Sequence, residues 1–233
     1  MWRLPLKTQP LRPEVAVPRG RRVRPEDQRS CQVHWRALGP QDVYDGEVTT
    51  PLRTVIDCAR TLPFDEALAV ADSALRARRV TRADLIQAAQ AVPRSGRAAA
   101  LRVAQEASGD AANPFESVLR AISLDVAGLH LVPQAPVVSA GRTIHPDLSD
   151  ADLRIVVEGD SHEFHTNPRQ IDIDCERYDE LTLDGWLVLR FSHRQAMARQ
   201  DWVRATMGRA AACRMTTTIP LPGTSRGEHR RAG

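Results

Sequence analysis

The chain has 233 residues, of which 42% are hydrophobic and 26% charged, a composition typical of a soluble globular protein. No run approaches the roughly 18 consecutive apolar residues of a membrane-spanning helix, and the first residues lack the apolar block of a secretion signal. We therefore expect a cytoplasmic protein without a membrane partner. The four cysteines are scattered and form no C-x-x-C pair, which argues against a disulfide framework or a zinc ribbon.

The formal net charge of +3 hides an uneven distribution along the chain. Residues 110–208 carry 9 arginines and 16 acidic side chains, a balance of −7, so the other residues together carry +10. Residues 1–30 alone hold eight basic and three acidic side chains. Because nucleic-acid binding generally rests on a positive surface, we expect any such surface to lie outside the acidic segment.

The N-terminal half predicts a basic arm followed by a small helical region. Residues 1–30 are rich in proline and arginine, lack apolar periodicity and are expected to be mostly irregular. Residues 31–109 are expected to be mostly helical, with Thr50 capping one helix and Thr81 opening another in a Thr-x-x-Asp pattern. A packed helical subdomain is the favoured interpretation, and a helix-turn-helix DNA reader in residues 64–91 is the alternative.

The C-terminal half predicts elements in the order α-β-β-β-α-β-α, which indicates the α/β class. The first helix begins at Asn113-Pro114. The later elements are strands over 130–138, 141–149 and 152–159, a helix from Asn167-Pro168 to Asp184-Gly185, a strand over 186–191, and a helix from Ser192 to about Met207. Residues 209–233 are expected to form a disordered basic tail.

A hydrophobic run over residues 153–157 leads directly into Glu158-Gly159-Asp160. Because side chains alternate along a strand, the carboxylates of Glu158 and Asp160 should leave the same face. Asp147 comes from the preceding predicted strand, so we expect three carboxylates to converge where the two strands lie side by side. Hard oxygen ligands on rigid elements build divalent-metal sites for phosphate chemistry, so Mg²⁺ or Mn²⁺ is the expected ion.

Four motifs occur in order along residues 110–207. They are NPFESVLR at 113–120, PDLSDADLRIVVEGDSHEFH at 146–165, DCERYDEL at 174–181 and GWLVLRF at 185–191. They resemble the PD-(D/E)XK nuclease superfamily and, within it, the very-short-patch-repair (Vsr)-like domain of unknown function five-five-nine. The stretch TTPLRTVIDCARTLPFDEALAVADSAL resembles the segment that precedes this domain in actinobacterial proteins related to AbiEi-type antitoxins.

The resemblance implies a restriction-endonuclease-like αβββαβ core over residues 110–208, a mixed sheet flanked by helices. It implies a metal-dependent endonuclease that hydrolyses phosphodiester bonds of DNA, with Asp147, Glu158 and Asp160 as metal ligands. Glu116 and His165 would then help to position or deprotonate the attacking water. Glu116 is also the third residue after Asn113, where a capping glutamate belongs, so both roles stay open.

Other polar side chains near the acidic motif are weaker candidates. His162 and His145 lie close in sequence to the motif, and histidine can move protons near neutral pH. On the long predicted helix, Gln170 and Arg177 are expected to face the metal site and contact nucleic acid. For Arg177, an i,i+3 ion pair with Asp174 is the alternative.

The chain departs from the family pattern at one position. Nucleases with the D…E-x-K pattern place a lysine near the scissile phosphate, but position 160 is Asp and lysine occurs only once, at Lys7. This substitution and the acidic balance favour an alternative function, a catalytically inactive nuclease-fold protein that binds DNA or regulates in an antitoxin-like way. Whether the chain is an enzyme therefore stays open at this point.

Overall fold

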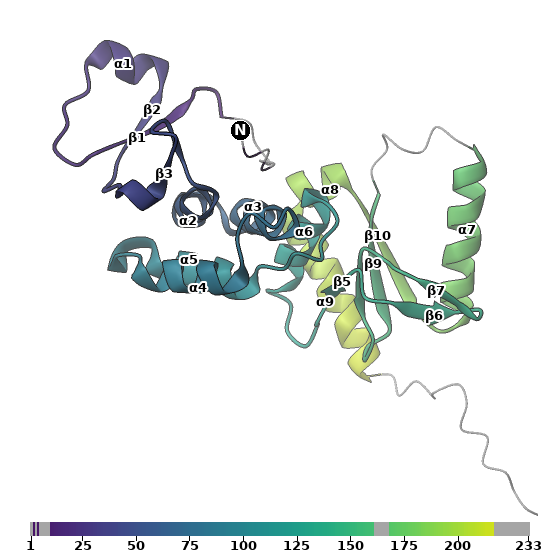
Figure 1. The fold of residues 1–233 in the computed structure, drawn as a ribbon. Helices are drawn as coiled ribbons and strands as arrows, with labels where there is room; N and C mark the ends of the chain where they lie inside the picture. Colours follow the sequence, from purple (N-terminus) through teal and green to yellow (C-terminus); the bar gives the residue numbers. More distant parts are fainter. Residues whose placement is uncertain (1, 3, 5–9, 161–167, 217–233) are drawn as a thin grey trace, which may run out of the picture.

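The computed structural model describes residues 2, 4, 10–160 and 168–216 of the chain. It shows an α/β protein in which a small β-rich region, a group of helices and a second region with the main sheet follow one another in space (Figure 1). Within the described residues, no helix is both long enough and apolar enough to span a membrane.

The β-rich region begins inside the stretch that was expected to be an irregular arm. Its elements are β1 (Glu14–Val17), α1 (Pro25–Ser30), β2 (Gln32–Trp35), the 3-10 turn η1 (Pro40–Asp42), β3 (Val43–Tyr44) and β4 (Val48–Thr49). β1 pairs with β2 in parallel, and β3 pairs with β4 antiparallel. The two short elements β1 and α1 therefore lie inside the arm that was expected to be mostly irregular, and the local pattern does not reveal β1 because its partner lies beyond α1.

The helical region matches its prediction closely. It comprises α2 (Pro51–Thr61), α3 (Phe64–Arg76), α4 (Arg82–Ala91) and α5 (Arg94–Glu106). The predicted caps form: Thr50 Oγ1 accepts a hydrogen bond from the backbone of Arg53, and Thr81 forms a reciprocal capping box with Asp84. The alanine-rich α3 is buried among its neighbours, which confirms a packed helical region.

The second region contains the main sheet and the helices around it. Its elements are α6 (Pro114–Ser123), β5 (Val132–Pro133), β6 (Val137–Ser139), β7 (Arg142–Ile144), β8 (Leu148–Asp150), β9 (Ile155–Asp160), α7 (Pro168–Leu183), β10 (Leu187–Ser192), α8 (His193–Ala198) and α9 (Gln200–Thr216). The four-stranded sheet has the order β10-β9-β8-β5. It is mixed, because β10 and β9 run parallel while β8 is antiparallel to both β9 and β5.

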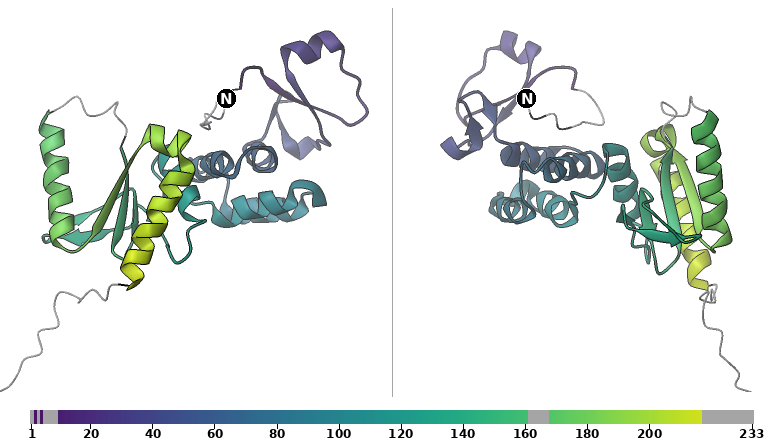
Figure 2. Two further views of the ribbon diagram at one scale, coloured as in Figure 1. Left: turned by 180° about the vertical axis from the view of Figure 1, so that it is seen from behind. Right: turned by 45° about the vertical axis from the view of Figure 1, so that its right-hand side comes forward.

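Helices cover both faces of this sheet. α7 lies on one face, and α6 and α9 lie on the other (Figure 2). Ile155 and Val157 of β9 pack in the core with α6 and α9, whereas Val156 packs with Leu181 of α7. This alternation buries both faces of β9 and places its C-terminal residues between two layers of helices.

Two long strands expected over residues 130–138 and 141–149 are each interrupted. The first splits into β5 and β6 and the second into β7 and β8, and the β6–β7 hairpin forms a separate two-stranded sheet. Pro136 and Pro146 fall in the breaks, where their missing N–H groups cannot contribute to a ladder. Gln134 adds a bend, because its φ of 53° is incompatible with a strand.

The last predicted helix is also divided. α8 ends before Arg199, whose non-helical backbone separates it from α9. α9 continues to Thr216, so the tail expected to be disordered over 209–233 is helical as far as residue 216. The rest of that stretch lies outside the described residues.

A buried ion pair joins the helical region to the second region. Arg120 of α6 donates to both carboxylate oxygens of Asp72 of α3 at 2.8 Å, and Asp72 also accepts from the backbone N–H of Ser108. Burial raises the pKa of Asp72, and the nearby Arg120 opposes that rise. The interface between α3 and α6 therefore contains a buried carboxylate, on Asp72, whose charge is compensated by the guanidinium of Arg120.

We expect Arg120→Met to lower the free energy of unfolding by about 3–5 kcal/mol, because it leaves the Asp72 carboxylate buried without its cation. Urea denaturation of both proteins measures the change. Arg142→Met is the matched control: it removes an exposed pair with Glu180 (2.9 Å), so less than about 1 kcal/mol should be lost. Equal losses in the two variants would contradict the role assigned to Arg120.

Candidate acidic site at the ends of β8 and β9

The register of β8 and β9 brings Asp147 and Glu158 together. Leu148 pairs with Val157, so Asp147, one residue before β8, lies beside Glu158. The Oδ2 atom of Asp147 accepts a hydrogen bond from the backbone N–H of Gly159 at 2.7 Å, and the backbone of Asp147 donates to the Glu158 carboxylate. The prediction that these two carboxylates are neighbours is confirmed.

Glu116 approaches Asp147 from the first turn of α6. Its side chain is 1% exposed and accepts hydrogen bonds from the backbone N–H of Ala112 (2.8 Å) and the side chain of Asn113 (2.7 Å). Asn113 in turn caps α6 by accepting from the backbone of residues 115 and 116. Glu116 therefore stabilises the start of α6, as expected of a capping residue. It also interacts directly with Asp147, as expected of a residue at the acidic site.

Gln134 also belongs to this site, although no motif in the sequence points to it. Its Nε2 donates to Glu116 Oε2 at 3.1 Å, and its backbone N–H donates to the carbonyl of Asp147 at 3.1 Å. Its carbonyl accepts from Nδ1 of His145 at 2.9 Å, which places that histidine beside the loop rather than at the carboxylates. The one possible signal in the sequence is its position between two prolines, which predicts a break in the strand but no role.

Position 159 requires a glycine because Phe115 and Asp147 lie close to its Cα atom. A Cβ atom at this position would lie 2.8 Å from Cε1 of Phe115 and 3.3 Å from Oδ2 of Asp147. The ring of Phe115 also contacts the ring of His193 edge to face, with centroids 5.4 Å apart. Even an alanine at 159 would therefore displace either the aromatic ring or the Asp147 carboxylate.

Arg177 of α7 lies against Glu158. Its Nη2 is 3.4 Å from Glu158 Oε1 and 3.8 Å from Asp174 Oδ1, so the predicted i,i+3 pair with Asp174 is present. Glu158 is 6% exposed, and its Oε1 accepts no hydrogen bond from the described residues. Arg177 is thus positioned by acidic groups of this site, while its predicted contact with nucleic acid stays a prediction.

Asp160 has a different cationic partner. Its Oδ2 accepts from Nη2 of Arg190, on the neighbouring strand β10, at 2.8 Å. The guanidinium groups of Arg190 and Arg177 lie 4.5 and 4.9 Å from the ring centroid of Tyr178. Tyr178 therefore separates two ion pairs, one at Glu158 and one at Asp160.

The three central carboxylates resist ionisation. Burial is the largest cause in each case, and it raises the pKa of Glu116 and of Glu158 to about 7. Burial also raises the pKa of Asp147, against the hydrogen bond from Gly159. Glu116 and Asp147 hydrogen-bond each other through their side chains, so the pair holds a shared proton when that bond is formed.

These carboxylates lie in a row, with Asp147 between Glu116 and Glu158. Among the described residues, no group of three or more acidic, histidine or cysteine side chains is arranged to hold a metal ion. The expected triad of Asp147, Glu158 and Asp160 is therefore not assembled, because Asp160 pairs with Arg190. Two oxygen-bearing side chains, on Asp147 and Glu158, remain next to each other.

Three predicted residues cannot be placed. His162 and His165 lie outside the described residues, and so does the side chain of Gln170, for which only the helical backbone of α7 is given. The structure therefore does not test their expected roles as proton carriers and as a nucleic-acid contact.

Because burial raises the pKa of Glu158 from 4.5 to about 7, the folded state binds more protons than the unfolded state between these pH values. The free energy of unfolding should therefore fall as the pH rises from 4.5 to 7, by on the order of 3 kcal/mol from this group. Glu158→Gln should remove that part of the pH dependence in urea denaturation at pH 5 and pH 8. Asp201→Asn, at a carboxylate whose side chain is 99% exposed, is the control. An unchanged pH dependence in Glu158→Gln would contradict the raised pKa.

Together the fold and the site define an α/β protein with a mixed sheet and a row of buried and half-buried carboxylates where α6 meets the ends of β8 and β9. Two uncharacterized proteins of Mycobacterium tuberculosis are similar to it: MT2308 of strain CDC 1551 / Oshkosh and Rv2248 of strain ATCC 25618 / H37Rv. Each is 32% identical over 197 residues, which is 83% of this chain and 69% of the relative. The chain belongs to the same family as these proteins. No family model and no solved structure matches it.

Proposed function

We propose that this protein is a metal-dependent endonuclease that hydrolyses phosphodiester bonds of DNA, with a restriction-endonuclease-like core of the PD-(D/E)XK type. The observation that carries the proposal is the juxtaposition of Asp147 and Glu158 at the ends of two paired strands. The mixed sheet between α6 and α7 supports the same core. The motifs that resemble Vsr-like domains come from these same elements.

The chemistry of the donors fits a hard divalent cation such as Mg²⁺ or Mn²⁺. Mg²⁺ is commonly held by one or two carboxylates and keeps several waters, so Asp147 and Glu158 suffice as protein ligands. Glu158 Oε1 is buried without a hydrogen bond from the described residues, and burial raises the pKa of both carboxyls even though Arg177 lies close by. When bound, such an ion would polarise the phosphate and lower the pKa of an attacking water.

The remaining side chains suit supporting roles. Glu116 has a pKa of about 7 and contacts Asp147, so it can take up or release a proton near neutral pH. Arg190 pairs with Asp160, at the position where nucleases of the D…E-x-K pattern have a lysine, so its guanidinium would stand near the scissile phosphate with Asp160 as its counter-ion. Arg177 would exchange its contact with Glu158 for a phosphate of the DNA when an ion neutralises Glu158.

Plasmid nicking in the presence of Mg²⁺ or Mn²⁺ tests this proposal. We expect Asp147→Asn to lower the rate by about 100-fold or more, because several kcal/mol of transition-state stabilisation by the ion would be lost. Asp152→Asn is the matched control, since Asp152 lies exposed in the turn at the other end of β8 and β9. Equal nicking by wild type and Asp147→Asn would overturn the assignment.

A second candidate is an inactive nuclease-fold protein that binds DNA or regulates in an antitoxin-like way. The observation that favours it is the pairing of Arg177 with Glu158 and of Arg190 with Asp160, since each arginine already neutralises a carboxylate. Under this candidate, DNA mobility shifts in EDTA would be strong while Mg²⁺ and Mn²⁺ produce no nicking. Metal-dependent nicking that requires Asp147 would exclude it.

A further inference from the structure

An arginine-lined cleft lies apart from the acidic row, where the N-terminal β-rich region meets helix α2 and the C-terminal end of α4. Its volume is about 530 Å³, which is within the range of small-molecule sites. Its charged and aromatic lining consists of Arg19, Trp35, Arg36, Asp42, Arg53 and Arg60. Nothing in the proposed hydrolysis uses these residues.

The arginines are brought together by helical spacing on α2 and by the pairing of β1 with β2. Arg53, Asp57 and Arg60 are spaced at i, i+4 and i+7, so they share one face of α2. β1 and β2 pair in parallel, so the residues that follow them, Arg19 and Arg36, leave the same end of that small sheet. The two sets meet because the sheet lies against this face of α2 (Figure 1).

Positive charge exceeds negative charge at this cleft. Asp57 is the shared counter-ion of three arginines: it lies 2.5 Å from Arg36, 3.0 Å from Arg53 and 3.7 Å from Arg60. Asp42 pairs with Arg53 at 3.0 Å. Four arginines with two carboxylates leave a balance of +2, which is opposite in sign and equal in magnitude to the charge of a phosphomonoester dianion.

Arg60 has unused capacity to bind an anion. Its Nε is buried and has no hydrogen-bond partner among the described residues. Burial lowers its pKa, and the charges of Arg36, Arg53 and Arg19 act in the same direction, against the effect of Asp57. An anion placed here would relieve this mutual repulsion.

Trp35 supplies an aromatic surface beside these charges. Trp35 is 44% exposed. Its Nε1 donates a hydrogen bond to the carbonyl of Arg21 at 2.9 Å, which fixes the orientation of the ring. Exposed aromatic rings next to arginines are typical of sites where a base stacks while its phosphate is held by charge.

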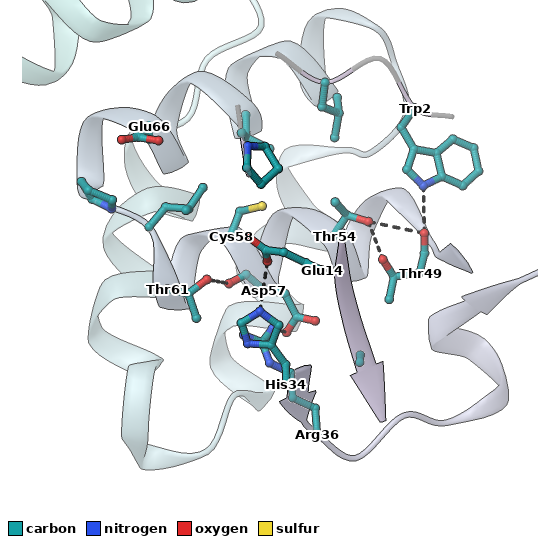
Figure 3. A pocket seen from close by; sticks show the side chains of 16 residues that line it. Trp2, Glu14, His34, Arg36, Thr49, Thr54, Asp57, Cys58, Thr61 and Glu66 are labelled. Atoms are coloured by element: carbon teal, nitrogen blue, oxygen red, sulfur yellow. Dashed lines mark hydrogen bonds and ion pairs between the residues drawn. The ribbon is translucent and has the colours of Figure 1, made fainter. Parts of the chain in front are cut away.

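A neighbouring pocket of about 750 Å³ shares Arg36 with this cleft but has a different character (Figure 3). There Glu14 pairs with His34 at 3.1 Å, and Asp57 and Glu66 accompany Arg36, so three carboxylates outnumber the basic groups. Burial raises the pKa of Cys58 to about 11, which keeps it a thiol and makes it a poor nucleophile. The excess of positive charge therefore belongs to the arginine-lined cleft.

We propose that the arginine-lined cleft binds a nucleotide unit, with its phosphate against Arg19 and Arg60 and its base against Trp35. The occupant that matches this charge balance is a free mononucleotide, whose phosphomonoester carries about two negative charges. One nucleotide of a single-stranded DNA presents the same base but a phosphodiester with a single negative charge, and the test distinguishes the two. This binding goes beyond the proposed hydrolysis and stands independently of it.

The test uses full-length Asp147→Asn protein in EDTA, so that its outcome is separate from any cleavage. Calorimetry with deoxyadenosine monophosphate and with inorganic phosphate, and fluorescence anisotropy with a labelled oligothymidylate, measure the affinities. We expect Arg19→Gln and Arg60→Gln each to weaken nucleotide binding about tenfold, as loss of one charged contact does. Trp35→Ala should weaken binding of the nucleotide but not of inorganic phosphate.

Arg204→Gln is the matched control and should bind like the parent, because the Nε of Arg204 is also buried without a hydrogen-bond partner among the described residues but Arg204 lies outside the cleft, paired with the exposed Asp201 on α9. Arg19 is exposed, so Arg19→Gln keeps the test valid even if Arg60→Gln lowers the melting temperature. Binding of the mononucleotide supports a small-molecule site, and binding of the oligonucleotide alone supports a site for a DNA strand. No binding of either, or equal affinities in Arg19→Gln and Arg204→Gln, would overturn the proposal.

Discussion

The hydrogen bond from the backbone of Gly159 to Asp147 holds the acidic site together, because it fixes one carboxylate between two others in a buried setting. Glu116 and Glu158 can approach Asp147 only where several donors compensate the loss of water. Asn113 and Gln134, the latter with a positive φ, donate hydrogen bonds to Glu116. The absence of a side chain at Gly159 lets the Asp147 carboxylate approach the backbone. The cost of burying these groups is visible in their raised pKa values.

The two sites differ in the sign of the charge that each lacks. At the acidic row, Glu116 and Glu158 are buried and Asp147 is half-buried, and the guanidinium of Arg177 pairs with Glu158 alone among them, so a cation is the missing partner. At the arginine-lined cleft, Asp57 serves three arginines, so an anion is the missing partner. The buried ion pair of Asp72 and Arg120 joins the two regions that contain these sites, because it holds α3 against α6. Both sites suit ligands that contain phosphate. Metal binding at the acidic row and nucleotide binding at the arginine-lined cleft can each be tested without the other.

Local rules predicted much of the fold and part of the site. Capping patterns located the starts of α2, α4 and α6, and the expectation that two consecutive strands lie side by side placed Asp147 next to Glu158. Non-local geometry could not be predicted. The parallel pairing of β1 with β2 joins residues separated by a helix, and the partners that Arg190 and Arg177 choose depend on how β10 and α7 pack. The contact of Gln134 with Glu116 likewise depends on a loop conformation that no residue pattern specifies.

Whether Asp147 and Glu158 bind a divalent ion decides the functional account. Thermal unfolding followed with increasing Mn²⁺ or Mg²⁺ measures this directly, because an ion that binds the folded state stabilises it by about 2.7 kcal/mol at a concentration of 100 Kd. The account predicts a melting temperature that rises with metal in the wild type and stays constant in Asp147→Asn. A melting temperature that ignores metal in the wild type, or rises equally in both proteins, would contradict it.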